Sequence, residues 1–185
     1  MVDINEYGQY YSGYDGKVHQ SDRPFFVDDW IWDTYLAKHP LNSILNPAMQ
    51  SDQLNSYVKM YEQSGWMATF PQVHGNHLCM NGYHTVALFL DAKRKGIAGF
   101  DLEQAYAGMK KTLAEATYLP WRQGHKKVAF DDFYTAHGYY PALHPGEAET
   151  EPLVDTFEKR QSVAISLGMR SEEHTSELQS LSHLV

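Results

Sequence analysis

The sequence has little of several features that would narrow its function at once. Its 185 residues include a single cysteine, Cys79, so no disulfide can form within the chain. No apolar run approaches the ~20 residues that a membrane-spanning helix needs. The first residues lack the basic and apolar regions of a signal peptide. With 15 Lys and Arg against 23 Asp and Glu, the net charge of −8 argues against nucleic-acid binding, which depends on clustered basic residues.

Aromatic residues are the component that stands out. They make up 14% of the chain, with 13 Tyr, 8 Phe and 4 Trp, while the hydrophobic share of 43% and the length suit one globular domain. Six of them fall at expected helix starts or in loops, where rings can line a cleft: Trp30, Trp32, Trp66, Trp121, Tyr139 and Tyr140. Most buried aromatic residues belong to a core, so this pattern is weak support for a binding site by itself.

Hydrophobic spacing and capping residues predict a mainly helical domain. Residues 1–24 read as loop with a short strand, and helices are expected over residues 30–37, 51–64, 81–95, 102–113, 131–137 and 155–167. Pro40 is expected to close the first helix, Gly65 the second, and Asp101 with Gln104 to form a capping box. Loops of ten to twenty residues separate several helices. Because long loops in a compact domain are usually functional, this favours an all-α enzyme domain over a tight bundle.

Residues 170–185 read differently from the rest of the chain. The string from Arg170 to Ser180 resembles the translation of a common sequencing-library adapter, and it follows closely on a helical stretch that ends at Gly168. We therefore expect the natural reading frame to run off its DNA fragment near Met169, and residues 170–185 to be an artefactual tail. Met1 would then equally be an internal methionine.

Potential metal ligands gather in one short stretch. His74, His77, Cys79 and His84 lie within eleven residues, but their spacing matches no standard zinc pattern and no second ligand cluster follows. Loop histidines near a helix start are the favoured interpretation, and no local signature marks Cys79 as a nucleophile.

Carboxylates offer a second kind of candidate. The pairs Asp28–Asp29 and Asp131–Asp132 are interpreted as helix caps, because paired catalytic carboxyls usually come from distant chain positions. Asp33 differs, since it lies inside an expected helix next to Trp32, where Asp has poor propensity. A ring beside a carboxylate suits a sugar, because the ring packs on its apolar face and the carboxylate accepts hydroxyl hydrogen bonds. A solvent-facing aspartate is an equally good alternative on this chemistry.

Several strings together resemble glycoside hydrolase family 92, the calcium-dependent exo-acting α-mannosidases. They run in order over nearly all of residues 1–169, with similar spacing: Tyr11-Ser12-Gly13-Tyr14-Asp15-Gly16-Lys17-Val18-His19, Asp28-Asp29-Trp30-Ile31-Trp32-Asp33-Thr34, His39-Pro40-Leu41, Met60-Tyr61-Glu62-Gln63-Ser64-Gly65-Trp66, Cys79-Met80-Asn81-Gly82-Tyr83-His84, Asp91-Ala92 with Lys95-Gly96, Leu119-Pro120-Trp121-Arg122, Gly138-Tyr139-Tyr140-Pro141-Ala142-Leu143, and Phe157-Glu158-Lys159-Arg160-Gln161.

The resemblance implies a fold and an activity. Residues 1–169 would form part of the family's catalytic domain, an (α/α) toroid of six helical hairpins. The family removes terminal α-linked mannose with inversion, using a general acid, a carboxylate base and a calcium ion on the sugar hydroxyls. The strings that we associate with acid, base and calcium (Glu-Gly-Asn-x-Trp-Gln, Gly-Asn-Glu-Pro and Asn-Asp/Glu-Asp-x-Gly) do not occur in the chain. We therefore expect catalytic residues and calcium ligands beyond Met169, and an inactive fragment.

The resemblance also implies three substrate-binding residues. Trp32 and Asp33 match positions that shape the terminal-mannose subsite, and His84 matches a position near the cleft. The expected partners are a mannose-containing glycan and the missing remainder of the domain, with no nucleic acid and no membrane, and the parent protein would be bacterial and periplasmic or secreted. Two alternatives stay open: a non-catalytic carbohydrate-binding or interaction protein, and another toroid hydrolase of the trehalase-like or glucoamylase-like kind.

Overall fold

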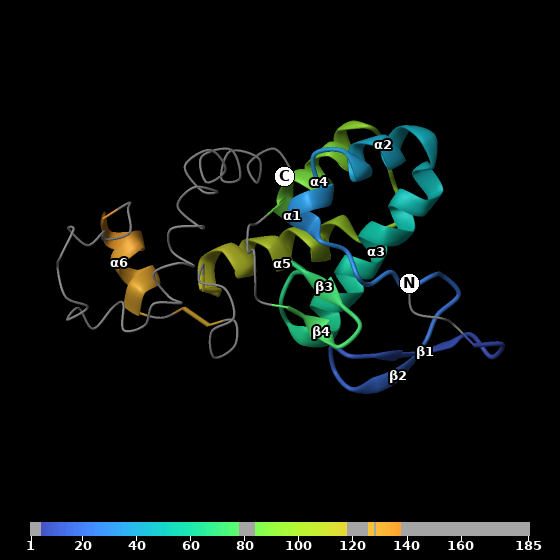
Figure 1. Cartoon of the computed structure of the whole chain (residues 1–185), viewed down its shortest axis with the longest axis horizontal. Coiled ribbons are helices and arrows are strands. Elements are labelled where there is room, and N and C mark those ends of the chain that lie inside the picture. The colour runs from blue at the N-terminus through green and yellow to red at the C-terminus, as the bar shows by residue number, and fades with distance from the viewer. Residues whose placement is uncertain (1–4, 78–83, 118–125, 128, 138–185) are drawn as a thin grey trace.

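Helices dominate the part of the chain that the structure describes. The computed structural model describes residues 5–77, 84–117, 126–127 and 129–137 (Figure 1). In chain order the elements are β1 (Gln9–Ser12), β2 (Lys17–Gln20), α1 (Ile31–Thr34), α2 (Lys38–Leu45), α3 (Pro47–Ser64), β3 (Pro71–Gln72), β4 (Gly75–Asn76), α4 (His84–Arg94), α5 (Leu102–Glu115) and α6 (Ala129–His137). This composition agrees with the expected all-α class. No helix in these ranges is long and apolar enough to cross a membrane.

The N-terminal segment is a hairpin rather than a loop with one strand. β1 and β2 pair antiparallel, with Tyr10 opposite His19, and the turn between them holds Gly16 at a φ of 69°. Tyr10 is buried and stacks on Phe25, with ring centroids 4.4 Å apart. This contact fastens the hairpin to the segment that leads into α1. A second, very short hairpin, β3–β4, occupies part of the expected loop between α3 and α4.

The first expected helix, residues 30–37, is shorter than predicted, and a helix that was not expected follows it. α1 has four residues, and α2 begins at Lys38 with Pro40 as its third residue. The prediction that Pro40 closes a helix is therefore wrong. The first four N–H groups of a helix have no acceptor within it, so proline costs little there and suits a beginning as well as an end.

The next helices follow their capping residues. α3 starts at Pro47, earlier than expected, because the Asn46 side chain caps it by accepting from the Met49 N–H at 3.2 Å. It ends at Gly65, which has a φ of 80°, as expected. Asp101 caps α5 by accepting from the Gln104 N–H at 3.0 Å, also as expected. The expected helix over 155–167, the tail 170–185, Cys79, Trp121, Tyr139 and Tyr140 lie outside the described residues.

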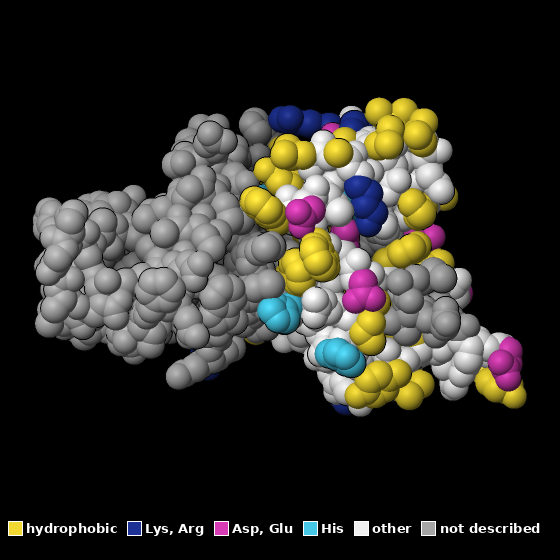
Figure 2. All heavy atoms as spheres, viewed as in Figure 1, with side chains coloured by type: hydrophobic (Ala, Val, Ile, Leu, Met, Phe, Trp, Pro, Cys, Tyr) yellow, Lys and Arg dark blue, Asp and Glu magenta, His cyan; other side chains and the backbone are white. Residues whose placement is uncertain are grey.

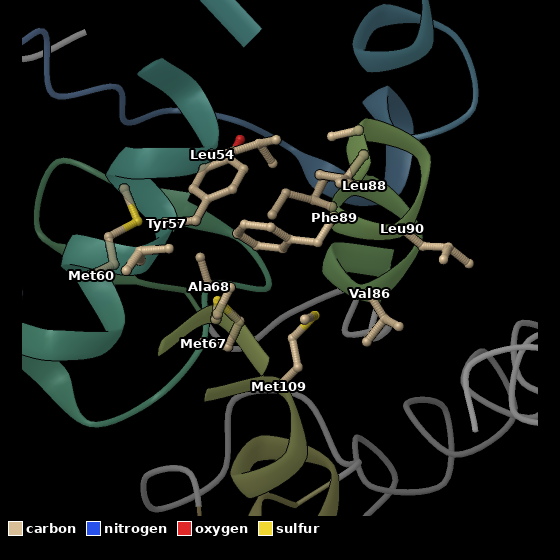
Figure 3. Packing of buried hydrophobic residues seen from close by; sticks show 14 of the residues in the cluster. Leu54, Tyr57, Met60, Met67, Ala68, Val86, Leu88, Phe89, Leu90 and Met109 are labelled. Carbon is tan, nitrogen blue, oxygen red and sulfur yellow. The ribbon is translucent and has the colours of Figure 1, made fainter. Parts of the chain in front are cut away.

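The core lies between α3, α4 and α5. Figure 3 shows Leu54 and Tyr57 of α3 pointing toward Leu88 and Phe89 of α4, with Met109 of α5 beside them. All five side chains are buried. The stripe expected on α3 is confirmed by this packing, and α1 joins the same core through the fully buried Ile31. Ile31 therefore anchors the short helix α1 to the core, while Trp32 and Asp33 on the same helix are exposed.

Candidate functional site

The two residues singled out by chemistry and resemblance are both at the surface. Trp32 is 36% exposed and Asp33 is exposed, while Ile31 beside them is buried. The Asp33 and Thr34 N–H groups donate to the Trp30 carbonyl at 2.8 and 3.0 Å, which closes the single turn of α1. The ring of Trp32 and the carboxylate of Asp33 are thus accessible to a ligand and carried by a rigid turn.

His84 lies next to this turn but inside the protein. It begins α4, is 2% exposed, and its ring stacks on Tyr35 with centroids 4.2 Å apart and an interplanar angle of 24°. Tyr35 directly follows α1. Burial lowers the pKa of His84 to about 4, so its ring is neutral near pH 7. The structure therefore brings the three candidates together, with His84 beneath the turn and the other two on its surface.

A buried polar cluster lies immediately before α1, around Asp29. The Asp29 carboxylate accepts from His39 Nε2 at 2.6 Å, from Lys38 Nζ at 2.9 Å, and from the Tyr57 hydroxyl. His39 also contacts the Gln50 amide oxygen through Nδ1 at 3.2 Å. Apart from Lys38, these side chains are almost completely buried. The cluster joins the segment before α1 to both α2 and α3.

The interpretation of Asp28 and Asp29 as helix caps is wrong. The N-cap of α1 is Trp30, and no side chain makes a capping hydrogen bond there. Asp29 turns inward instead, following Asp28, whose φ of 58° is unusual for a residue other than glycine. No local signal in the sequence marks this role, because a cap and a buried anchor look alike when the partners are distant. Asp131 and Asp132 lie in the first turn of α6, after its start at Ala129, so they are not N-caps either.

The cluster fixes the charge of Asp29. Burial raises the pKa of its carboxyl, but the hydrogen bond and charge of His39, with Tyr57 and Lys38, outweigh burial and hold that pKa well below its usual value. Burial and the neighbouring Asp29 charge raise the pKa of Tyr57 well above 10. Asp29 is thus an ionised anchor, and with all its oxygens engaged it is not positioned to serve a substrate.

Exposed aromatic rings continue beyond Trp32. Trp30 is 53% exposed and stacks on the buried Phe70, with centroids 5.4 Å apart and planes at 30°. Phe70 in turn contacts His77, with centroids 5.7 Å apart. Trp66 lies elsewhere, under the Lys111 ammonium at 4.6 Å. Among the described residues, some aromatic side chains belong to the core, whereas Trp30 and Trp32 form a small exposed group at α1.

A metal has no evident place among these residues. Within residues 5–77, 84–117, 126–127 and 129–137, no three His, Cys, Asp or Glu side chains form a group that could hold a metal ion. Calcium needs a cluster of oxygen ligands. The described residues therefore do not fit a calcium site, and none of them is assigned to the metal.

Comparison with known proteins adds the family to this picture. The model of the glycosyl hydrolase family 92 catalytic domain matches residues 1–176.

The chain belongs to glycoside hydrolase family 92.

Solved structures of this family resemble the chain in fold. The family 92 inverting mannosidase BT2199 from Bacteroides thetaiotaomicron VPI-5482 shares 26% identity with a TM-score of 0.63, over 99% of this chain and 24% of that protein. The family 92 α-mannosidase BT3965 from Bacteroides thetaiotaomicron shares 26% identity with a TM-score of 0.64, over 94% of this chain and 23% of that protein. A complex of BT3965 with mannoimidazole gives 25% identity and a TM-score of 0.62, over 94% and 22%.

The comparisons also show how much of a family 92 protein the chain represents. It spans about a quarter of the length of these family 92 structures. A search of curated proteins finds no match. Membership of family 92 sets aside the trehalase-like and glucoamylase-like alternatives. Chemically, the surface at α1 offers indole faces that can pack on a sugar and the exposed Asp33 carboxylate, which can accept hydrogen bonds from its hydroxyls.

Proposed function

We propose that this chain forms part of the terminal-mannose subsite of an exo-α-mannosidase that acts on mannose-containing glycans. The observation that carries the proposal is the exposed pair Trp32 and Asp33 on a rigid turn, in a chain that matches family 92 over residues 1–176. Support also comes from the similar solved structures, whose proteins are α-mannosidases and one of which holds mannoimidazole.

Each candidate residue has a distinct part in this proposal. The Trp32 ring packs on the apolar face of the mannose, and the Asp33 carboxylate accepts hydrogen bonds from its hydroxyls. A hydrogen bond to a charged group contributes about 1.5–3 kcal/mol, so the loss of Asp33 would weaken sugar binding by about this much. His84 holds Tyr35, and with it the end of α1, from beneath.

The proposal for the whole enzyme goes further than for this chain. Hydrolysis with inversion, dependence on calcium and an (α/α) toroid are proposed from the family resemblance, and none of the described residues is given a part in them. We also propose that the chain alone does not hydrolyse α-mannosides, because the three strings associated with acid, base and calcium are absent from its sequence.

Sugar binding by the purified chain tests the subsite. Methyl α-mannoside, titrated against tryptophan fluorescence, should bind more tightly than methyl α-glucoside. Asp33→Ala should weaken the binding of the mannoside about tenfold or more, which corresponds to at least about 1.4 kcal/mol. Asp132→Ala is the matched control, since Asp132 is an exposed aspartate on α6. Equal affinity of wild type and Asp33→Ala would remove Asp33 from the site.

A hydrolysis assay tests the proposed inactivity of the chain alone. A chromogenic α-mannoside with added calcium should release no product above the blank when the chain alone is present. Product release above the blank would refute the proposed inactivity. Binding of methyl α-glucoside as tightly as the mannoside would reject the mannose subsite and favour a general carbohydrate-binding role.

A further inference from the structure

Trp30 occupies a position that local helix chemistry does not favour. It is the N-cap of α1, where Ser, Thr, Asp or Asn would satisfy a free N–H group at the helix start. Trp30 supplies no such hydrogen bond, although two aspartates directly precede it. Its indole is also 53% exposed, so it gains little from burial. Neither capping nor core packing accounts for a tryptophan at this position.

The exposed ring is nevertheless held in place. One face stacks on Phe70, which is itself 4% exposed and therefore anchored in the protein. The backbone is fixed on both sides, since the Asp29 N–H donates to the Pro71 carbonyl at 3.1 Å and the Trp30 carbonyl accepts from Asp33 and Thr34. With one face packed and half of its surface exposed, the ring presents its other face to solvent. A rigid, solvent-facing indole is a preorganised platform.

Trp30 also has a defined relation to the proposed mannose subsite. The N-cap residue and the third helical residue are three positions apart in the first turn of a helix. Trp30 and Asp33 hold these two positions in α1. They are separated by about 4.5 Å along the helix axis. This short offset puts the Trp30 ring within reach of a glycan whose terminal mannose binds at Asp33.

We propose that Trp30 is a stacking platform for the second sugar of the glycan, the residue to which the terminal mannose is linked. A pyranose ring has an apolar C–H face that packs on an indole, and such a contact does not depend on a particular hydroxyl. The platform thus distinguishes a disaccharide from a monosaccharide, whereas Trp32 and Asp33 bind the terminal residue. The proposal rests on the mannose subsite proposed above.

The test compares two probes on the intact chain. Methyl α-mannoside reports the terminal subsite alone, and α-linked mannobioses report both positions. We expect wild type to bind at least one mannobiose about tenfold more tightly than methyl α-mannoside, equivalent to about 1.4 kcal/mol. Trp30→Ala should bring this ratio to within twofold of one, and Trp30→Phe should keep part of it. Trp66→Ala is the control and should keep the wild-type ratio, because Trp66 packs under Lys111 away from α1.

The outcomes separate this inference from the function on which it rests. A wild-type ratio near one, or an unchanged ratio in both Trp30 variants, overturns the platform while methyl α-mannoside binding still supports the subsite. Mannobiose binding that needs Trp30, with no binding of methyl α-mannoside, shows a sugar contact at Trp30 but rejects the monosaccharide subsite, and with it the assignment of Trp30 to the second sugar. Failure of a folded chain to bind either probe overturns both. Ligand-observed NMR with saturation transfer provides an independent readout of the same ratios.

Discussion

At the scale of single residues, the buried Asp29 cluster should matter most for stability. Asp29→Ala leaves His39 and Tyr57 buried without their acceptor and removes the partner of Lys38. Removing one partner of a buried ionic pair costs about 3–5 kcal/mol, because the remaining polar groups stay desolvated. We expect a loss of this size in the free energy of unfolding, measured by urea denaturation followed by circular dichroism.

A surface aspartate in an ion pair is the control for Asp29. Asp91 pairs with Lys95 at 2.7 Å, one helical turn away, and about a third of each side chain is exposed. Exposed pairs of this kind contribute at most about 1 kcal/mol. Asp91→Ala should therefore change the unfolding free energy far less than Asp29→Ala. Similar losses in the two variants would show that burial of the Asp29 cluster adds nothing.

The second residue-scale prediction concerns pH. His84 has a pKa of about 4 in the folded protein, below the 6.5 of an unperturbed histidine, because its ring is buried. Between these values the unfolded chain binds more protons than the folded chain, so stability falls as the pH is lowered from 6.5 to 4. The loss from this group is about 3 kcal/mol. We expect His84→Phe, which keeps a ring against Tyr35, to remove this part of the decline.

Unfolding midpoints in urea at several pH values between 7 and 4 measure this effect. His74→Phe is the control, because His74 is exposed and should leave the decline as in wild type. An equally steep decline in His84→Phe would mean that His84 is not the group responsible. The ionised Asp29 carboxylate also stabilises the folded protein, but this stabilisation is lost at a lower pH than that of His84, because the pKa of Asp29 is depressed below the usual aspartate value.

For single residues, the sequence shows which side chains could bind a sugar better than it shows which side chains are buried or which partners they contact. Trp32 and Asp33 could be singled out because a ring next to a carboxylate is visible in the sequence itself. Asp29 could not, since its partners Lys38, His39 and Tyr57 are 9, 10 and 28 residues away and only the packing of α2 and α3 brings them to it. The exposure of Trp30 likewise depends on a distant residue, Phe70.

At the scale of elements, the contact of α5 with α3 depends on Gly108. Glycine in a helix interior is about 1 kcal/mol less favourable than alanine, so its presence needs a reason. A Cβ atom on Gly108 would lie 2.8 Å from Tyr61 Cγ and 2.8 Å from Met67 Cε. We therefore expect Gly108→Ala to destabilise the protein by about 1–3 kcal/mol, because the overpacking outweighs the gain in helix propensity. Thermal unfolding followed by circular dichroism measures it.

The neighbouring position separates packing from propensity. Ala107 is exposed on α5, so Ala107→Gly changes helix propensity without removing a packed side chain, and should cost about 1 kcal/mol. If propensity alone decided both positions, Gly108→Ala would raise the unfolding temperature by a comparable amount. Such a rise would contradict the close approach of α3 and α5.

The sequence predicts a helix end best when that end depends on hydrogen bonds within one turn. Asp101 with Gln104 and Gly65 all act within one turn, and the structure has them as expected. Pro40 misleads because the same ring suits a helix start and a helix end. The early end of α1 at Thr34 and the separate helix α2 from Lys38 have no such local signal in the sequence.

At the scale of the whole molecule, an apolar patch marks a surface that the chain does not cover. Its members are large aliphatic residues from α2 and the turn before it, each more than half exposed: Leu36, Leu41, Ile44 and Leu45. Figure 2 shows apolar side chains gathered at the corner of the molecule where Figure 1 places α2. Soluble monomers rarely expose contiguous apolar patches of this kind, so a partner surface is expected there. The chain spans about a quarter of its family 92 relatives, which suits a contact supplied by further family structure.

We therefore expect the isolated chain to bind an environment-sensitive dye such as anilinonaphthalene sulfonate and to self-associate as its concentration rises. The double variant Ile44→Lys with Leu45→Lys should reduce both effects, since the added charges oppose contact between apolar surfaces. Because both side chains are exposed, unfolding should change by no more than about 0.5 kcal/mol for each substitution. Val18→Lys is the control, as Val18 is an exposed apolar residue on β2, away from the patch. Dye fluorescence measures dye binding, and sedimentation velocity measures self-association. Equal values for the double variant and wild type would show that the patch is not the surface responsible for either effect.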